Sequence, residues 1–235
     1  MEIKMNKTIE IIPQQTLEAQ VLDRLREAIL EGYFEPDSQL NQVLVAQQLG
    51  TSRGPIRAAL SKLEEEGLVV NVPHRGTFVT SLDRKKVCDL YDVRAVLEAH
   101  AVRLAVPQMS EAEQNQFEKI VNQMQKAAVE GNTNQVIAGD FVIHEFFIER
   151  SGNSVLRQTW STLKIQVRRA LAFRHRGYPN LQELADSHFP FIELLRSKDA
   201  EGAARLMDAH IREACDDLME RWSVDKEPAG FYVKP

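Results

Sequence analysis

The chain has 235 residues, of which 43% are hydrophobic and 27% charged, as is usual for a globular protein with a substantial core. No apolar run approaches the roughly 18 residues that span a membrane, and the first residues lack the apolar segment and cleavage site of a signal peptide. The two cysteines, Cys88 and Cys215, form no CxxC motif. These features argue against a membrane protein and a disulfide framework, and they predict a cytoplasmic location.

The charge balance argues against a general nucleic-acid binder. The net charge is −5 at pH 7, and residues 1–80 carry 8 Lys and Arg against 11 Asp and Glu. Non-specific affinity for DNA comes from neutralising phosphates. Any DNA binding by this chain must therefore depend on a local basic patch.

Three helices are predicted in the N-terminal part. Thr16 caps the first, which carries an apolar i, i+4 stripe and ends at Gly32. The second runs from about residue 41 to 49, and Ser52 caps the third, which ends before Gly67. The side chains expected to face the core are Leu17, Val21, Leu25 and Ile29 in the first helix, Leu44, Val45 and Leu49 in the second, and Ile56, Leu60 and Leu63 in the third.

Two β-type runs, LVVNV and TFVT, follow the third helix and are separated by residues 73–76. This pattern is typical of a β-hairpin. The order helix, helix, turn, helix, hairpin is that of a winged helix-turn-helix. We therefore predict a DNA-binding domain of this kind over residues 1–80.

No strand pattern is found from Asp83 onward, and helix breakers divide the rest of the chain. One boundary carries a capping box at the start of a helix. In this motif the side chains of Ser110 and Glu113 each accept a hydrogen bond from the backbone amide of the other. The pattern predicts a mainly α protein whose second domain, residues 81–235, is an all-α helical bundle with a frayed tail from about residue 224. Six helices are expected, at about 84–105, 111–130, 134–150, 154–174, 181–197 and 200–222.

Several segments carry a specific resemblance. The run GTSRGPIRAALSKLEEEGLVVNVPHRGTFV resembles the recognition helix and wing of the GntR family of transcription regulators. The segments YDVRAVLEAHAVRLA, DFVIH, SGN, SH and AH are similar to the FadR-type helical sensor domain, called FCD, of that family. The resemblance covers about residues 17–222, and the expected six sensor helices favour its shorter, VanR-like branch.

Arg53 and Arg57 lie four residues apart near the start of the third predicted helix, so both project from one face. Arginine suits bidentate contact with guanine or the clamping of a phosphate, and Ser52 can add contacts at the helix N-terminus. Arg75 lies at the hairpin tip, where an arginine can enter a minor groove. The alternative is that these arginines are merely solvated.

The resemblance implies DNA contacts at Arg53, Gly54, Arg57 and Gly76, position by position. The glutamates at 64–66 end the third helix and should point away from DNA. The implied partner is double-stranded operator DNA, read by a homodimer at a palindromic site, because one short recognition helix reads only a few base pairs. The stripe Val87, Leu90 and Leu97 could form the dimer surface or the core.

Asp140 and His144 lie four residues apart on one helical face, where a carboxylate and an imidazole can share a metal ion. The resemblance aligns His188 and His210 with histidines of the metal pocket of the family. We therefore expect one divalent ion per chain, and this nitrogen and oxygen donor set suits Zn, Ni or Mn alike. A lone histidine on a helix is more often a core or surface residue, and His74, His100 and His175 receive no role.

Arg94 matches an arginine that faces the effector pocket in this family, although it could instead form a surface salt bridge with Glu98 one turn later. We expect the protein to be a transcription regulator. The favoured role is that of a repressor that leaves its operator when a small carboxylate effector binds. A dedicated divalent-metal sensor is the alternative. A metal-dependent enzyme is a weaker one, because the sequence offers no positioned general base, nucleophile pattern or GxGxxG loop.

Overall fold

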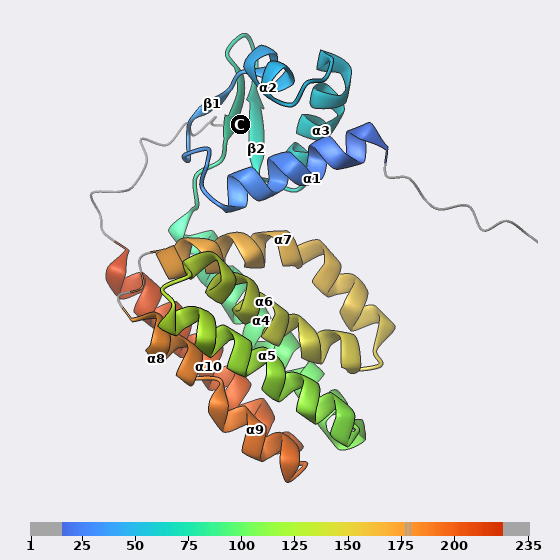
Figure 1. The fold of residues 1–235 in the computed structure, drawn as a ribbon, viewed down its shortest axis with the longest axis vertical. Helices are drawn as coiled ribbons and strands as arrows, with labels where there is room; N and C mark the ends of the chain where they lie inside the picture. The colour runs from blue at the N-terminus through green and yellow to red at the C-terminus, as the bar shows by residue number, and fades with distance from the viewer. Residues whose placement is uncertain (1–15, 177, 179, 223–235) are drawn as a thin grey trace, which may run out of the picture.

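The computed structural model describes residues 16–222 except 177 and 179, and the tail predicted to fray from about residue 224 lies outside these described residues. The chain forms two lobes that lie one above the other in Figure 1. The upper lobe is a winged helix-turn-helix with a small antiparallel sheet, and the lower lobe is a helical bundle. The predicted mainly α fold class is confirmed. In the described part of the chain, no helix combines the length and apolarity needed to cross a membrane.

Helix α1 of the upper lobe begins after Thr16, whose hydroxyl accepts a hydrogen bond from the Ala19 amide at 3.2 Å. Asn41 caps α2 in the same way, through the amides of the first turn. The predicted hairpin is present, but a third strand pairs with it, so the sheet order is β1-β3-β2. The elements are α1 (Leu17–Leu30), β1 (Gln39–Leu40), α2 (Gln42–Gln48), α3 (Arg53–Glu65), β2 (Val69–Val72) and β3 (Gly76–Val79).

The core of the upper lobe contains most of the side chains predicted for it, with three corrections. Leu44 and Leu49 are 56% and 38% exposed, because α2 has only seven residues and buries Val45 and Ala46 instead. Leu17, in the first turn of α1, is also exposed, since the helix contacts the core only from Val21 onward.

The lower lobe contains seven α-helices and one short 3-10 helix within the described residues. The predicted capping box of Ser110 and Glu113 is present at the start of α5. The helices are α4 (Arg84–Ala105), η1 (Val106–Gln108), α5 (Glu111–Val129), α6 (Thr133–Arg150), α7 (Ser154–Arg176), α8 (Leu181–Asp186), α9 (Phe189–Arg196) and α10 (Ala200–Arg221).

The predicted helix 181–197 is in fact two helices, with the break at Ser187 and His188. Pro190 lies in the first turn of α9, where its missing amide hydrogen leaves no helical bond unmade. His188 occupies the N-cap position of α9. The prediction of six helices is therefore wrong, and the helix count gives no support to the VanR-like branch.

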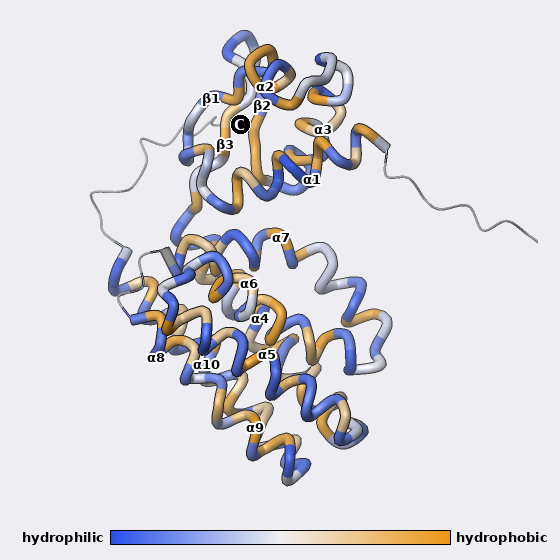
Figure 2. Tube along the Cα trace, in the orientation of Figure 1, coloured by the Kyte–Doolittle hydropathy of each residue, from blue (hydrophilic) through white to orange (hydrophobic). Residues whose placement is uncertain are grey.

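Helix α4 packs against α10 along much of the bundle. Val87 is buried, and Leu90 and Leu97 pack against the same core, so the stripe considered for a dimer surface belongs to the bundle interior. The hydrophobic side chains that α4 exposes are instead Val93 and Val96. Hydrophobic and hydrophilic segments alternate along the helices of both lobes, as amphipathic helices require (Figure 2).

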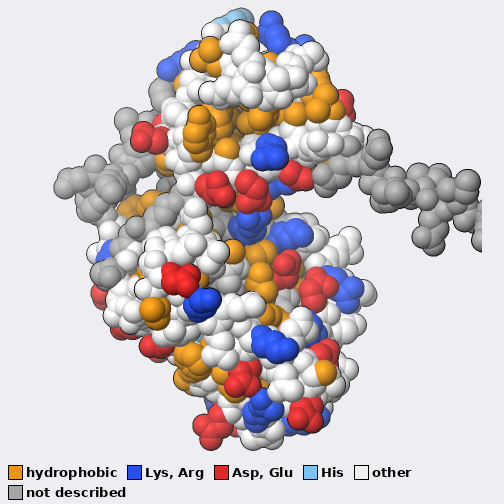
Figure 3. Space-filling model, viewed as in Figure 1, with side chains coloured by type: hydrophobic (Ala, Val, Ile, Leu, Met, Phe, Trp, Pro, Cys, Tyr) orange, Lys and Arg blue, Asp and Glu red, His pale blue; other side chains and the backbone are white. Residues whose placement is uncertain are grey.

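Helix α7 contacts both lobes. Its Val167 lies in the bundle core, whereas Ile165 packs against the core of the upper lobe. Arg168 forms an ion pair with Glu27 of α1 at 2.8 Å, and Arg169 donates to the Thr80 hydroxyl at 2.7 Å and to its carbonyl. Acidic and basic side chains gather where the lobes meet (Figure 3).

Candidate functional site

The N-terminus of α3 presents the predicted DNA-reading residues to solvent. Ser52 is the N-cap, and its hydroxyl makes no capping hydrogen bond. Arg53 and Arg57 are exposed, and neither forms an ion pair with any residue that the structure describes. Ile56, which lies between them in the sequence, is completely buried and anchors this end of the helix in the core, while both arginine side chains stay exposed.

Gly54, between these arginines, is not required by the packing of the protein. The nearest atom to a Cβ built at this position is the Ser52 hydroxyl oxygen, at 4.0 Å. Gly54 is the second residue of α3, and glycine costs up to about 1 kcal/mol relative to alanine in a helix, with the full cost in the interior. The packing of the protein therefore leaves room for a side chain at this exposed position between the two arginines.

The hairpin tip is held by β1. The Gln39 side-chain amide donates to the Arg75 carbonyl at 2.6 Å, and a Cβ at Gly76 would lie 2.8 Å from the same nitrogen. Gly76 also has φ 103°, which favours glycine. The structure thus gives Gly76 a conformational role in the wing, and it leaves the exposed Arg75 side chain at the tip, near the Phe78 ring.

Three acidic residues of the upper lobe, Glu64, Glu65 and Glu66, lie at the far end of α3, about 18 Å from Arg53 at 1.5 Å per residue. Each is engaged there: Glu66 with Arg26 at 2.6 Å, Glu65 with Lys62 at 2.8 Å, and Glu64 with the Asn71 amide at 2.9 Å. That separation exceeds the screening length of about 8 Å at physiological salt. These three carboxylates therefore do not cancel the positive charge at Arg53.

The structure brings the four predicted metal ligands together inside the lower lobe. One donor atom from each of Asp140, His144, His188 and His210 lies within 4.8 Å of the others. The His188 Nε2 is 3.2 Å and the His144 Nε2 3.8 Å from the Asp140 Oδ1. Three helices supply the group, because α6 carries the first two residues, the α9 N-cap the third and α10 the fourth.

Other contacts orient these donors. The His144 Nδ1 lies 2.5 Å from the Glu98 carboxylate, and the His188 Nδ1 lies 3.2 Å from the Leu184 carbonyl. In both rings Nε2 is left to face the cluster, which is the usual arrangement of a metal-binding histidine. The other Asp140 oxygen, Oδ2, lies 3.1 Å from the His175 Nε2.

The protonation of the cluster suits a cation. Burial alone would raise the pKa of Asp140, but the neighbouring His175 and His144 outweigh it and hold that pKa well below its usual range. Burial, together with His188 and His144, holds the pKa of His210 well below its usual value. The cluster thus offers a carboxylate and a neutral imidazole, which are the forms that bind metal.

The donor geometry fits a divalent ion. Ligand bonds of about 2.1 Å place neighbouring donors about 3.0 to 3.4 Å apart and opposite donors about 4.2 Å apart, so the observed spread needs only a small contraction. Two of the facing atoms, the Asp140 Oδ1 and the His188 Nε2, are buried without a hydrogen bond. A shared cation would satisfy both.

Arg94 lies beside this cluster and is 1% exposed. Its Nε donates to Glu98 at 2.8 Å, so the pair with Glu98 exists but is buried, and the surface pair considered from the sequence is wrong. Burial opposes both charges, but their attraction lowers the pKa of Glu98 and raises that of Arg94. The Arg94 Nη2 and the Tyr91 hydroxyl are buried without hydrogen-bond partners, and the guanidinium carbon lies 4.9 Å from the centre of the Tyr91 ring.

Three residues of this centre were missed or misassigned from the sequence. From the sequence, Glu98 is expected only as a surface partner of Arg94. The spacing of four residues between them was the signal available for their ion pair, but it does not reveal that the pair is buried. His175 received no role, and nothing near it in the sequence indicates that α7 brings it to Asp140. Tyr91 begins the segment that carries the family resemblance, but only the fold shows its buried hydroxyl.

Comparison with known proteins identifies both lobes. The family model described as "Bacterial regulatory proteins, gntR family" matches residues 17–79, and the model described as "FCD domain" matches residues 89–213. The structure of E. coli McbR/YncC is similar in fold, with a TM-score of 0.76, 22% identity, and coverage of 89% of this chain and 100% of that chain.

Two curated relatives align along nearly the whole chain. The HTH-type transcriptional regulator YdhC of Bacillus subtilis (strain 168) is 27% identical over 88% of this chain and 93% of its own. The probable D-xylose utilization operon transcriptional repressor of Paenarthrobacter nicotinovorans is 29% identical over 88% of this chain and 91% of its own. The chain therefore belongs to the GntR family of bacterial regulatory proteins, carries an FCD domain, and is a transcriptional regulator rather than an enzyme.

Proposed function

We propose that this regulator is a repressor that binds operator DNA through α3 and the wing and releases it when a small carboxylate binds at a metal centre in the FCD domain. The observation that carries the effector chemistry is a pair of buried donors without partners, the Arg94 Nη2 and the Tyr91 hydroxyl. A buried donor that makes no hydrogen bond costs about 1–3 kcal/mol. A ligand that accepts from both recovers this free energy, and a carboxylate is an acceptor of that kind.

In this proposal one divalent ion per chain is held by Asp140, His144, His188 and His210. Four protein donors leave open positions on a six-coordinate ion. The ion supplies Lewis acidity toward an incoming oxygen donor. With the metal bound, an effector carboxylate would meet this Lewis acidity, and Arg94 would pair with it, because guanidinium pairs well with carboxylate.

DNA recognition in this proposal rests on Arg53 and Arg57, with Ser52, Gly54 and Arg75 completing the contact surface. A homodimer reads a palindromic site, since two recognition helices double the number of base pairs read. The relative that controls D-xylose utilization is named as a repressor, which supports repression here.

Helix α4 is the element that couples the two events. It begins at Arg84, four residues after the upper-lobe contact at Thr80, and it carries both Arg94 and Glu98. An effector that binds Arg94 and displaces its side chain therefore acts on α4, the helix that directly follows the wing. A ligand shifts such an equilibrium only by its different affinity for the two arrangements, so the acid must bind the DNA-free arrangement more tightly.

The experiment is a thermal-shift screen of metabolite carboxylates, amino acids and sugar acids on metal-loaded protein, followed by an operator titration with each hit. We expect an acid to stabilise the protein and to weaken operator binding. The Tyr91→Phe variant, which leaves the Arg94 ion pair intact, should weaken the response, and Arg94→Ala should abolish it. Arg103→Ala, on the exposed part of the same helix, is the matched control. Hits that are all neutral, or a normal response in Arg94→Ala, would contradict the proposal.

A dedicated metal sensor is the second candidate, and the compact donor cluster favours it. In that case the ion itself is the signal. Operator titrations of chelator-treated and metal-loaded protein, without any organic acid, separate the two. A large change in operator affinity with metal alone favours the sensor, whereas a change only on addition of the acid favours the carboxylate mechanism.

A further inference from the structure

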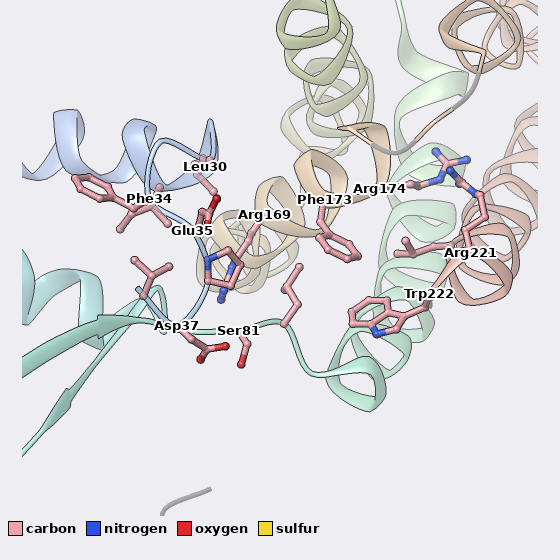
Figure 4. Close-up of a pocket in the computed structure, with 16 residues that line it drawn as sticks. Leu30, Phe34, Glu35, Asp37, Ser81, Arg169, Phe173, Arg174, Arg221 and Trp222 are labelled. Carbon is pink, nitrogen blue, oxygen red and sulfur yellow. The ribbon is translucent and has the colours of Figure 1, made fainter. Parts of the chain in front are cut away.

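A cavity of about 740 Å³ lies between the two lobes (Figure 4), and none of the four residues of the metal cluster lines it. Its volume is within the range of about 300–1,000 Å³ that is usual for small-molecule sites. The upper lobe, the segment that follows the wing, and the bundle all contribute to its wall. Its lining residues include Leu30 and Phe34 from the upper lobe, Ser81 and Leu82 from the connecting segment, and Phe173 and Trp222 from the bundle.

One end of the cavity is basic. Arg174 and Arg221 lie together there in Figure 4, and both stack on the Tyr178 ring, at 5.0 and 4.6 Å from its centre. Both contact the Asp217 carboxylate, which lies 3.5 Å from Arg174 and is bonded more closely to Arg221. Two guanidinium groups therefore lie side by side at this end of the cavity.

Arg174 is the unusual member of this end. It is only 6% exposed, its one ion pair is long, and its Nε is buried without a hydrogen-bond partner among the described residues. Burial of a charged donor that is not fully paired is costly. Among the described residues, Asp217 is the one anionic partner of Arg174, and the Arg174 Nε has no acceptor.

Three charged residues line the cavity nearer the upper lobe, Glu35, Asp37 and Arg169, and the arginine among them has a structural role. Arg169 is bonded to Thr80 and to the Gly67 carbonyl, so its guanidinium fastens α7 to the upper lobe. Burial lowers the pKa of Arg169 to about 10, partly offset by Asp37, and the group stays cationic at neutral pH. Since its hydrogen bonds are made within the protein, the ligand charge must be met at the other end.

The wall beside Arg174 is aromatic. The Phe173 and Trp222 rings have centres 4.8 Å apart at 48°, and Phe173 is 38% exposed. Leu218 and Leu82 extend the apolar surface toward the connecting segment. An aromatic pair beside a buried cation matches a molecule with a planar apolar body and one negative charge.

We propose that this cavity is a second ligand site, which binds an aromatic monocarboxylate with its carboxylate on Arg174 and Arg221 and its ring against Phe173 and Trp222. The site contains no residue of the metal centre, so it goes beyond the effector site proposed above. Its occupant touches both lobes and Ser81 and Leu82, which join the wing to α4. Binding therefore stabilises this arrangement of the lobes relative to others. An effect on operator affinity rests on the proposed function, whereas binding itself does not.

The binding test uses tryptophan fluorescence. The chain has two tryptophans, Trp160 and Trp222, so Trp160→Phe leaves Trp222 as the only reporter. The probe is 4-phenylbutyrate, and the matched neutral compound is 4-phenylbutanamide. We expect a saturable fluorescence change with the acid and a much weaker one with the amide. Arg174→Met should weaken binding by at least about tenfold, the loss expected for one charge-assisted contact.

Arg157→Met is the control on the same helix, because Arg157 is half-exposed and far along α7 from the cavity. Arg174 precedes His175, which contacts Asp140, so Arg221→Gln provides a second variant that does not adjoin the metal cluster. Removing metal with a chelator, or replacing Arg94, should leave acid binding unchanged. The proposal is overturned by no saturable change up to about 10 mM acid, by equal binding of acid and amide, or by loss of binding on chelation.

Discussion

Arg94→Met tests the buried ion pair at the heart of the FCD domain. Arg94 and Glu98 are 1% and 0% exposed and 2.8 Å apart, so the substitution leaves a carboxylate buried without its strongest partner. Removing one member of a buried pair costs about 3–5 kcal/mol. His144 still contacts Glu98, at 2.5 Å, so we expect the lower end, about 3 kcal/mol. This is a large part of a typical total stability of about 5–15 kcal/mol.

The assay is urea unfolding with a chelator present, at one fixed protein concentration, because oligomerisation makes stability concentration-dependent. Trp160, buried in the bundle core, reports the unfolding of that lobe. Arg103→Met is the matched control, since its pair with Glu201 lies on the same helix but is largely exposed and should be worth less than about 1 kcal/mol. Replacing Arg94 and Glu98 together by Met and Gln should recover part of the loss. Equal effects of Arg94→Met and Arg103→Met would refute the reasoning.

Three other predictions concern the metal cluster, Gly54 of α3 and Gly76 of the wing. Elemental analysis of untagged protein should find one divalent ion per chain. The double variant His144→Ala, His210→Ala should lose the ion, whereas the control His100→Ala, at an exposed position, should keep it. Unchanged metal content in the double variant would place the ion elsewhere. Gly54→Ala should raise the unfolding free energy by up to about 1 kcal/mol yet weaken operator binding, and unchanged binding would show that nothing approaches this position closely. Gly76→Ala should destabilise the upper lobe by about 1–3 kcal/mol because φ is 103° and Gln39 is in the way; a neutral effect on urea unfolding would show that the wing adapts.

Much of the DNA-binding lobe could be predicted from the sequence because its signals are local. Thr16 caps α1 and Ser52 begins α3, as the order of capping and apolar residues indicated. The third strand could not be predicted in this way. Gln39 and Leu40 form β1 only because Phe78 and Thr77 lie opposite them, and two residues carry no alternating pattern of their own.

The four candidate ligands of the metal cluster could be predicted from the sequence, but the residues that contact them could not. Asp140 and His144 share a helical face, a relation visible in the sequence, and the resemblance supplied His188 and His210. The contact of His175 with Asp140 joins residues 35 positions apart through the packing of α6 and α7. The sequence also leaves the break before α9 open, since Pro190 could lie in the first turn of a new helix or kink a longer one, and the structure shows the first arrangement.

The measurement that tests the central claim most directly is operator binding by the double variant Arg53→Ala, Arg57→Ala. The operator is first selected from a random duplex pool with the wild-type protein, and affinity is then measured by fluorescence anisotropy at one salt concentration. The account predicts a loss of about 1–3 kcal/mol for each arginine, whereas Lys62→Ala, whose side chain pairs with Glu65 at the other end of α3, should bind normally. Full operator affinity in the double variant would contradict the assignment of α3 as the DNA-reading helix.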